Sequence, residues 1–203
     1  MVARRARLVA VAADVFTRTG YTQATFAQIA REAGVSVKTI YAWFDGKIGL
    51  FRAVTDHFSQ RIEPAARTVL RPGAPPEEAM ARAAELVIGF ALSPPLLAFQ
   101  RAVVGASAED PAIGGTYNRN GPMRGYAVLR EYLEHCAREG LLCVPDPEGS
   151  IDLFLGLVWG DALRWRLLDV EASPLAPEEI RRRARRAASL FMALHAPEPK
   201  KGN

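Results

Sequence analysis

Apolar residues near the start of the chain recur with the spacing of amphipathic helices. The first set stands at i, i+3, i+4, i+7 and i+8, which predicts a helix over residues 2–19 that Gly20 ends. Ile29, Ala30 and Ala33 form a second, smaller apolar face, which predicts a short helix after Thr25. The residues of the first set are Leu8, Val11, Ala12, Val15 and Phe16.

The residues around the second helix carry start and stop signals. Thr25 is followed three residues later by Gln28, a capping-box pattern. Gly34 stands where a helix usually ends in a left-handed residue, and Ser36 is suited to cap a further helix from Val37 to about residue 44. Two helices separated by a short turn with glycine predict a helix-turn-helix, whose second helix enters the DNA major groove.

The rest of the chain also reads as helices. Pro64 is expected to kink or end the helix over 46–70, and the sequence R-P-G-A-P-P over 71–76 predicts a linker. A loop is expected over 105–111, and glycine and asparagine weaken any helix over 113–122. No segment alternates like a strand, so we predict an all-α protein. The expected helices span 46–70, 76–92, 96–106, 122–139, 150–168 and 177–195, with 150–168 apolar nearly all round and therefore buried on several sides.

Composition and charge sharpen this picture. Of the 203 residues, 49% are hydrophobic and 24% charged, which suits a soluble protein with an ample core. No apolar run approaches the roughly 20 residues of a membrane span, and no signal peptide is recognisable, so we expect a cytoplasmic protein. Residues 1–50 hold seven basic and three acidic residues, whereas the remainder is balanced. The whole excess positive charge of +4 therefore lies in the segment that contains the predicted DNA-binding helices, where it favours attraction of DNA phosphates.

Residues for catalysis or metal binding do not form a recognisable set. His57, His135 and His195 are scattered, and the chain has no phosphate-binding loop, no G-x-S-x-G and no H-E-x-x-H. Cys136 and Cys143 lack metal-ligand spacing, which leaves a redox switch or two buried or half-buried thiols. We therefore expect no enzyme activity, no cofactor and no metal.

The stretch from Gly20 to Lys47 resembles the DNA-binding domain of TetR/AcrR-family transcriptional regulators. It matches the spacing I-A-x-x-A-G-V-S-x-x-x-I-Y-x-x-F-x-x-K without gaps, and residues 114–161 loosely resemble the AefR-type C-terminal domain. The resemblance implies a three-helix DNA-binding domain over 1–48, a larger helical effector-binding and dimerisation domain over 49–196, and a disordered tail over 197–203. Dimerisation is expected through the last two long helices.

The resemblance also implies which residues contact DNA. The first three residues of the recognition helix are expected to face base edges or the nearby backbone. Two aromatic residues are expected to meet the sugar-phosphate backbone or a thymine methyl, and three further residues to lie at phosphates. Thr25 is first a helix cap, and the two aromatic residues alternatively pack at the edge of the domain. In chain order the eight are Thr25, Gln28, Val37, Lys38, Thr39, Tyr41, Trp43 and Lys47.

In the larger domain the resemblance implies a pocket for a small molecule that the sequence does not identify. Eight residues are candidates for its lining, although aromatic residues at helical spacing usually belong to an ordinary core. They are Phe90, Phe99, Tyr117, Met123, Tyr126, Phe154, Trp159 and Trp165.

Taken together, these expectations describe a homodimeric repressor that binds double-stranded DNA at a palindromic operator and is released by a small-molecule effector. An activator of the same fold is the alternative. An enzyme, or a helical adaptor without DNA binding, would need features that the sequence does not display.

Overall fold

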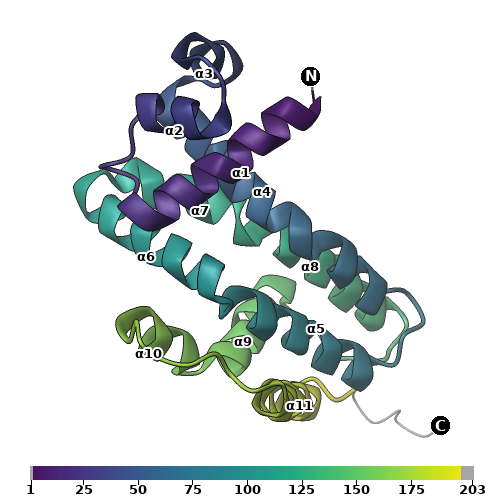
Figure 1. Cartoon of the computed structure of the whole chain (residues 1–203). Helices are drawn as coiled ribbons and strands as arrows, with labels where there is room; N and C mark the ends of the chain where they lie inside the picture. The colour runs from purple at the N-terminus through teal and green to yellow at the C-terminus, as the bar shows by residue number, and fades with distance from the viewer. Residues whose placement is uncertain (1, 198–203) are drawn as a thin grey trace, which may run out of the picture. The chain divides into compact units, whose positions relative to one another are not determined.

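The structure, a computed structural model, describes residues 2–197, of which 122–124 are described by their backbone alone. Over this range it contains eleven helices and no strand, so the all-α prediction is confirmed (Figure 1). The predicted tail lies outside the described residues except for residue 197. The helices are α1 Val2–Thr19, α2 Phe26–Ala33, α3 Val37–Trp43, α4 Gly46–Val69, α5 Pro76–Ala91, α6 Pro94–Glu109, α7 Pro111–Asn120, α8 Pro122–Arg138, α9 Pro147–Trp159, α10 Ala162–Leu168 and α11 Pro177–Leu194.

Packing groups the chain into two compact units. Unit one comprises residues 1–61 and 94–123, and unit two comprises 62–93 and 124–203. The helix-turn-helix therefore shares a unit with α6 and α7, and the boundary falls inside α4. The functional division after residue 48 that the sequence suggested stays a prediction.

Unit one is built on a core of large apolar side chains. The α1 helix packs against α2 and α6, and α6 packs against α7. Phe99 of α6 lies 5.7 Å from Phe51 and 4.8 Å from Phe58 between ring centres. These aromatic contacts explain why α6 belongs with the helix-turn-helix. The fully buried side chains from α1 to α4 include Phe16, Ile29, Ile40, Leu50 and Phe51.

Unit two is organised around α11, which packs most extensively against α5 and also against α9 (Figure 1). Buried alanines such as Ala84, Ala184 and Ala188 allow the close approach of α5 and α11. Phe191 is fully buried and stacks on His195, with ring centres 4.0 Å apart. The ring nitrogen Nε2 of His195 lies 2.9 Å from the hydroxyl of Ser150. This contact connects the end of α11 to α9.

Two expected breaks between helices are absent. The α6 helix continues through Gly105 to Glu109, where a loop was predicted, because Val103 and Ala106 are buried and their packing outweighs the weak helix propensity of glycine. Residues 111–120 form α7, since the Asp110 carboxylate caps its first turn through the Ala112 amide at 2.9 Å. Tertiary contacts and a cap thus override the local composition.

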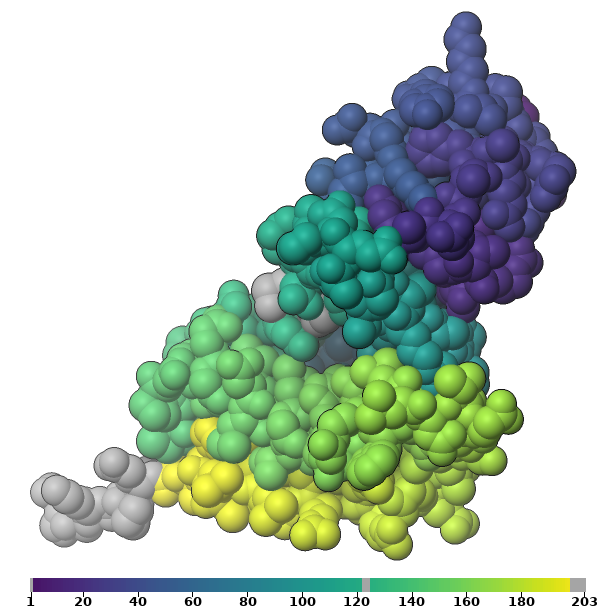
Figure 2. Space-filling model, turned by 90° about the vertical axis from the view of Figure 1, so that its left-hand side faces the viewer, coloured from purple at the N-terminus to yellow at the C-terminus, as the bar shows by residue number. Residues whose placement is uncertain are grey.

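The predicted helix over 150–168 is wrong in one respect. It divides into α9 and α10 at Gly160, whose φ of +45° is a backbone conformation that favours glycine. No residue of α10 is buried, and the helix lies on the surface of unit two (lime green in Figure 2). Trp165 and Leu168 are 59% and 72% exposed. The expectation that this segment is buried on several sides therefore holds for α9 alone.

The structure also bears on Pro64 and on the two cysteines. Pro64 stands inside α4 and does not end it, and the hydroxyl of Thr68 bonds its carbonyl at 2.9 Å. The two cysteines are both free thiols, but Cys136 is buried whereas Cys143 is exposed. Burial raises the pKa of the Cys136 thiol, which makes it less reactive.

Candidate DNA-binding site

The turn between α2 and α3 has the geometry that the sequence predicts. Gly34 adopts a left-handed conformation, with φ of 68° and ψ of 40°, and ends α2. The amide of Val35 donates to the carbonyl of Ala30 at 3.0 Å, which closes the turn. Ile29 and Ile40 are both fully buried, and α2 packs against both α1 and α3. The orientation of α3 is therefore fixed by a backbone turn and by packing.

Each helix of the motif has a side-chain cap. The Thr25 hydroxyl accepts from the Gln28 amide at 3.2 Å, and the Ser36 hydroxyl accepts from the Thr39 amide at 3.0 Å. The Gln28 side chain does not return to Thr25, as a complete capping box requires, but donates to Glu32 at 3.3 Å. The Thr39 hydroxyl lies 2.8 Å from that of Ser36, so it is shared between the cap and any DNA contact.

Removal of the second cap is expected to loosen the recognition helix. Ser36→Ala leaves the amide of Thr39 without its side-chain acceptor, which should lower the free energy of unfolding by about 1 kcal/mol. Ser36→Asn, which keeps an acceptor, should stay within about 0.5 kcal/mol of the original chain. Urea unfolding followed by circular dichroism measures both, and equal losses in the two variants would contradict the role of the cap.

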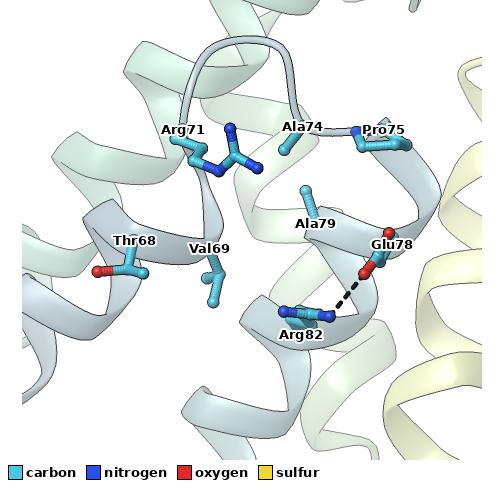
Figure 3. A pocket seen from close by; sticks show the side chains of 8 residues that line it. All are labelled: Thr68, Val69, Arg71, Ala74, Pro75, Glu78, Ala79 and Arg82. Carbon is cyan, nitrogen blue, oxygen red and sulfur yellow. Dashed lines mark ion pairs between the residues drawn. The ribbon is translucent and has the colours of Figure 1, made fainter.

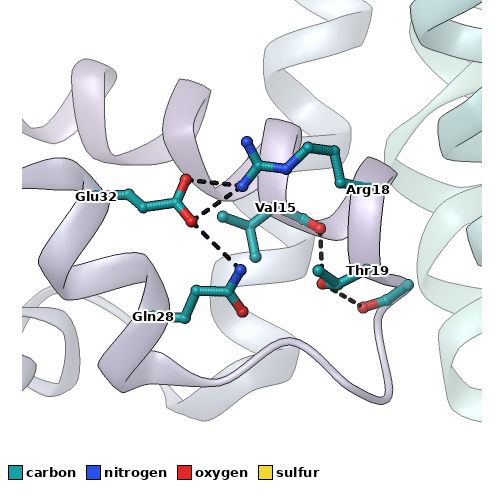
Figure 4. Close-up of polar contacts among 6 residues, drawn as sticks. Val15, Arg18, Thr19, Gln28 and Glu32 are labelled. Atoms are coloured by element: carbon teal, nitrogen blue, oxygen red, sulfur yellow. Dashed lines mark hydrogen bonds and ion pairs between the residues drawn. The ribbon is translucent and has the colours of Figure 1, made fainter.

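A polar cluster joins α1 to α2 on the surface of the motif (Figure 4). One guanidinium nitrogen of Arg18 donates to both oxygens of Glu32, at 2.9 and 2.8 Å. These hydrogen bonds from Arg18, with the one from Gln28, hold the pKa of Glu32 below its usual range. Thr19, at the end of α1, bonds the carbonyl of Val15 at 2.9 Å. Gln28, a predicted phosphate contact, therefore lies beside a carboxylate.

The exposed face of α3 carries the predicted base-contacting residues. Val37, Lys38 and Tyr41 are exposed, Thr39 and Trp43 are half-buried, and Ile40 is turned into the core. Tyr41 is 63% exposed, and its ring meets that of Phe26 edge-on at 4.9 Å. The structure therefore presents the start of α3 and one aromatic side chain to the solvent, with the anchor on the opposite face.

Basic side chains of α1 and α4 lie around the same motif. One guanidinium nitrogen of Arg4 donates to the carbonyl of Gly34 at 3.4 Å, and the Arg5 guanidinium lies 4.8 Å from the centre of the Phe44 ring. Lys47 donates from Nζ to the carbonyl of Thr22 at 3.0 Å. The sequence gave no signal for the partner of Lys47, which is 25 residues away.

The candidate pocket residues divide between the two units. Phe99 and Tyr117 belong to unit one, with ring centres 6.2 Å apart, whereas five others belong to unit two. The side chain of Met123 lies outside the described residues. The five in unit two are Phe90, Tyr126, Phe154, Trp159 and Trp165, of which Phe154 is fully buried and Trp165 largely exposed.

A small hollow lies between the end of α4 and the start of α5 (Figure 3). Its volume is about 60 Å³, and Thr68, Arg71, Ala79 and the ion pair of Glu78 with Arg82 are among its lining residues. Pockets for drug-sized ligands have volumes of roughly 300–1,000 Å³, so this hollow is too small to hold such a molecule. The predicted effector pocket stays a prediction. Between residues 2 and 197, no group of three His, Cys, Asp or Glu side chains is arranged to hold a metal ion.

Comparison with known proteins matches two regions of the chain to families of transcriptional regulators. Residues 8–54 match the family described as bacterial regulatory proteins of the tetR family. Residues 78–197 match the family described as the AefR-like transcriptional repressor, C-terminal domain, a wider region than the resemblance noted from the sequence. The chain is also 27% identical to the HTH-type transcriptional regulator SrpR of Pseudomonas putida over 161 residues, which cover 77% of this chain and 72% of SrpR.

Solved structures show the same fold. A putative TetR-family regulator from Mesorhizobium loti superposes with a TM-score of 0.84 at 20% identity, covering 96% of this chain and 97% of that one. The regulator FadR from Bacillus subtilis, solved with stearoyl-CoA, superposes with a TM-score of 0.71 at 16% identity, covering 91% and 96% of the two chains.

The fold and the exposed, capped helix α3 define a DNA-binding transcriptional regulator of the helix-turn-helix class. The chain belongs to the TetR family, with a C-terminal domain of the AefR-like type. The described part of the chain contains no single helix long and apolar enough to cross a membrane, and α5 with α6, joined at a bend, meets the criterion only as a pair.

Proposed function

We propose that this chain acts in the cytoplasm as a homodimeric repressor, which binds a palindromic operator and is released from it by a small-molecule effector. The observation that carries the proposal is the geometry of α3. Ile40 is buried in the core, while Val37, Lys38 and Tyr41 are exposed on a helix whose first turn is capped by Ser36. Such a helix can enter the major groove without rearrangement of the motif.

Charge supports contact with the DNA backbone. Seven basic residues stand against three acidic ones in residues 1–50, and one of those acids, Glu32, is already paired with Arg18. Lys38 is exposed, so its charge is available to a phosphate or a guanine edge. The remaining DNA contacts proposed are those of Thr25, Gln28, Thr39, Trp43 and Lys47.

Exposed apolar side chains support association of two copies. Leu190 and Leu194 are exposed one turn apart on α11, and Leu153 is exposed on α9, although large apolar side chains usually avoid water when no partner covers them. A two-fold dimer would place two copies of α3 for two half-sites roughly 34–36 Å apart or somewhat more. The stearoyl-CoA in the FadR structure supports a small molecule as effector, without identifying the one bound here.

The direct test is DNA binding by the purified chain. A gel shift with the DNA upstream of its own gene should show a complex of two chains per site, lost when one half of the inverted repeat is scrambled. The complex should weaken steeply with salt, because phosphate contacts release counterions. A chain that binds no upstream fragment, or binds scrambled and intact repeats equally, would rule the proposal out. Transcription from the same promoter, with and without the chain, separates repression from activation.

Tyr41 allows a test at the level of one residue. Tyr41→Ala removes an exposed ring and should weaken operator binding about tenfold, a typical effect for a central contact, with little loss of stability. Tyr41→Phe keeps the ring and its edge-on contact with Phe26, so it separates the hydroxyl from the ring. A Tyr41→Ala chain that is folded and binds at full strength would remove Tyr41 from the interface.

A further inference from the structure

The ammonium group of Lys47 is held by the segment between α1 and α2. Its Nζ donates to the carbonyl of Thr22 at 3.0 Å and lies 4.8 Å from the centre of the Tyr21 ring. Partial burial lowers the pKa of Lys47 from its ordinary value. An ammonium carries three N–H donors, so the bond to Thr22 leaves two for a phosphate. Lys47 is thus oriented before any DNA arrives.

Thr22 is held in turn by the last residue of α6. Its hydroxyl donates to a carboxylate oxygen of Glu109 at 2.9 Å, although the two residues are 87 positions apart in sequence. The α6 helix also packs against α1. Hydrogen bonds therefore connect the end of α6, through a single loop residue, to the lysine of the predicted phosphate contact.

Aromatic side chains beneath this chain of bonds tie the same elements together. The Tyr21 ring lies 5.2 Å from that of Phe51, which lies 5.7 Å from Phe99 of α6. Tyr21 also lies 5.4 Å from Phe16 of α1. Offset and edge-on aromatic pairs of this kind favour one arrangement over its alternatives. The loop that holds Lys47 is therefore supported by the packing of Tyr21 against the aromatic core and by the hydrogen bond from Thr22 to Glu109.

We propose that Glu109 is a positioning residue for the phosphate contact of Lys47 and acts through Thr22. This inference rests on the proposed DNA-binding function and adds to it the residue that sets one backbone contact. Without the Glu109 acceptor, the loop loses the hydrogen bond that holds Thr22. The carbonyl of Thr22 then no longer fixes Nζ of Lys47. Lys47 then regains rotamer freedom that DNA binding has to remove, which weakens the contact. Because Glu109 ends α6, any displacement of that end would change the same contact.

Simple electrostatics predicts the opposite sign. Removal of a negative charge from a DNA-binding unit should strengthen DNA binding, since it reduces repulsion of the phosphates. Positioning predicts that Glu109→Ala weakens it. Glu109→Gln removes the same charge but keeps an oxygen that accepts from the Thr22 hydroxyl. The two variants therefore separate charge from position.

The experiment measures the affinity of the full chain for a mixed-sequence duplex of about 30 base pairs at several salt concentrations, because phosphate contacts do not depend on sequence. For Glu109→Ala we expect a loss of roughly three- to tenfold near 0.1 M salt and a slope of log affinity against log salt that is shallower by about one. Glu109→Gln should retain the slope and bind at least as tightly as the original chain. Thr22→Val should behave like Glu109→Ala, and Thr22→Ser like the original chain.

Lys47→Gln supplies the reference for a lost phosphate contact. Its slope should be shallower by about one, and Glu109→Ala should cause no further loss of affinity in its presence. Equal behaviour of Glu109→Ala and Glu109→Gln, or additive losses in the double variant, would overturn the positioning role alone. An unchanged slope in Lys47→Gln would overturn both the phosphate contact and the role of Glu109, and an original chain that binds no duplex would overturn the proposed function itself. Thermal unfolding of every variant confirms that the folded chains are compared.

Discussion

Ile40→Ala is expected to destabilise unit one more than any substitution on the exposed face of α3. Ile40 is fully buried and is the buried residue of the recognition helix, which packs against α2. Truncation of a buried isoleucine typically costs 2–5 kcal/mol, because apolar contacts are lost and a cavity remains. Since whole domains are stable by only about 5–15 kcal/mol, this loss should be visible as an early unfolding step in urea.

The matched control for Ile40→Ala stands three residues earlier on the same helix. Val37 is 37% exposed, so Val37→Ala should change the free energy of unfolding by no more than about 0.5 kcal/mol. Val37→Ala should instead weaken operator binding, because Val37 is proposed to face bases, whereas Ile40 is not proposed to contact DNA. A loss below about 1 kcal/mol in Ile40→Ala would mean that α3 is not anchored as the packing indicates.

Lys38→Glu is expected to have the largest effect on DNA binding. Removal of one lysine–phosphate contact weakens binding about eightfold near 0.1 M salt, and a glutamate in its place adds repulsion, so the total loss should be on the order of 50-fold. Lys38 is exposed at the second position of α3, so the variant should retain the fold. Affinity for the operator and for mixed-sequence DNA, measured across a range of salt, gives the result.

Two comparisons define what Lys38→Glu means. Arg71→Glu makes the same change in net charge at an exposed residue of unit two, so it should affect binding far less. If Lys38→Gln weakens the operator and the mixed-sequence duplex alike, Lys38 meets a phosphate. If it weakens the operator alone, Lys38 reads a base edge. Equal losses in Lys38→Glu and Arg71→Glu would show that only net charge matters and would remove Lys38 from the interface.

The polar cluster of Arg18, Gln28 and Glu32 adds a constraint to the interface. Gln28 donates to Glu32, and Glu32 is bonded by Arg18, so a phosphate at Gln28 would approach a carboxylate. Thr39 has a related double use, since its hydroxyl lies against that of Ser36. The residues with the fewest competing roles are Val37, Lys38 and Tyr41. These three therefore give the sharpest tests of the proposed operator contacts.

Much of the motif was predictable because its signals are local. A glycine in the left-handed region ends α2, a hydroxyl caps α3, and apolar residues repeat at helical spacing within α1. Each of these features depends on residues no more than eight positions apart. Backbone sterics and helix geometry act over that range, so the sequence alone carries the information.

The errors arose where packing outweighs local preference. Gly105 was read as a loop residue, yet buried neighbours keep it in α6. Residues 150–168 were read as one helix from their apolar composition, but composition does not show that Gly160 takes a φ of +45° or that α10 lies on the surface. A pattern of apolar residues indicates that a segment has something to bury, and only the surrounding elements decide whether it does.

The sequence by itself therefore determined the all-α fold, the helix-turn-helix, the family and the exposed face of α3, because all of these follow from short-range spacing. Only the tertiary structure decided that α6 and α7 share a unit with the helix-turn-helix, and that Glu109 accepts a hydrogen bond from Thr22 beside Lys47. The physical reason is distance along the chain. A hydrogen bond between residues 87 positions apart leaves no periodic trace in the sequence, and it exists because aromatic packing brings α6 onto the core beneath the recognition motif.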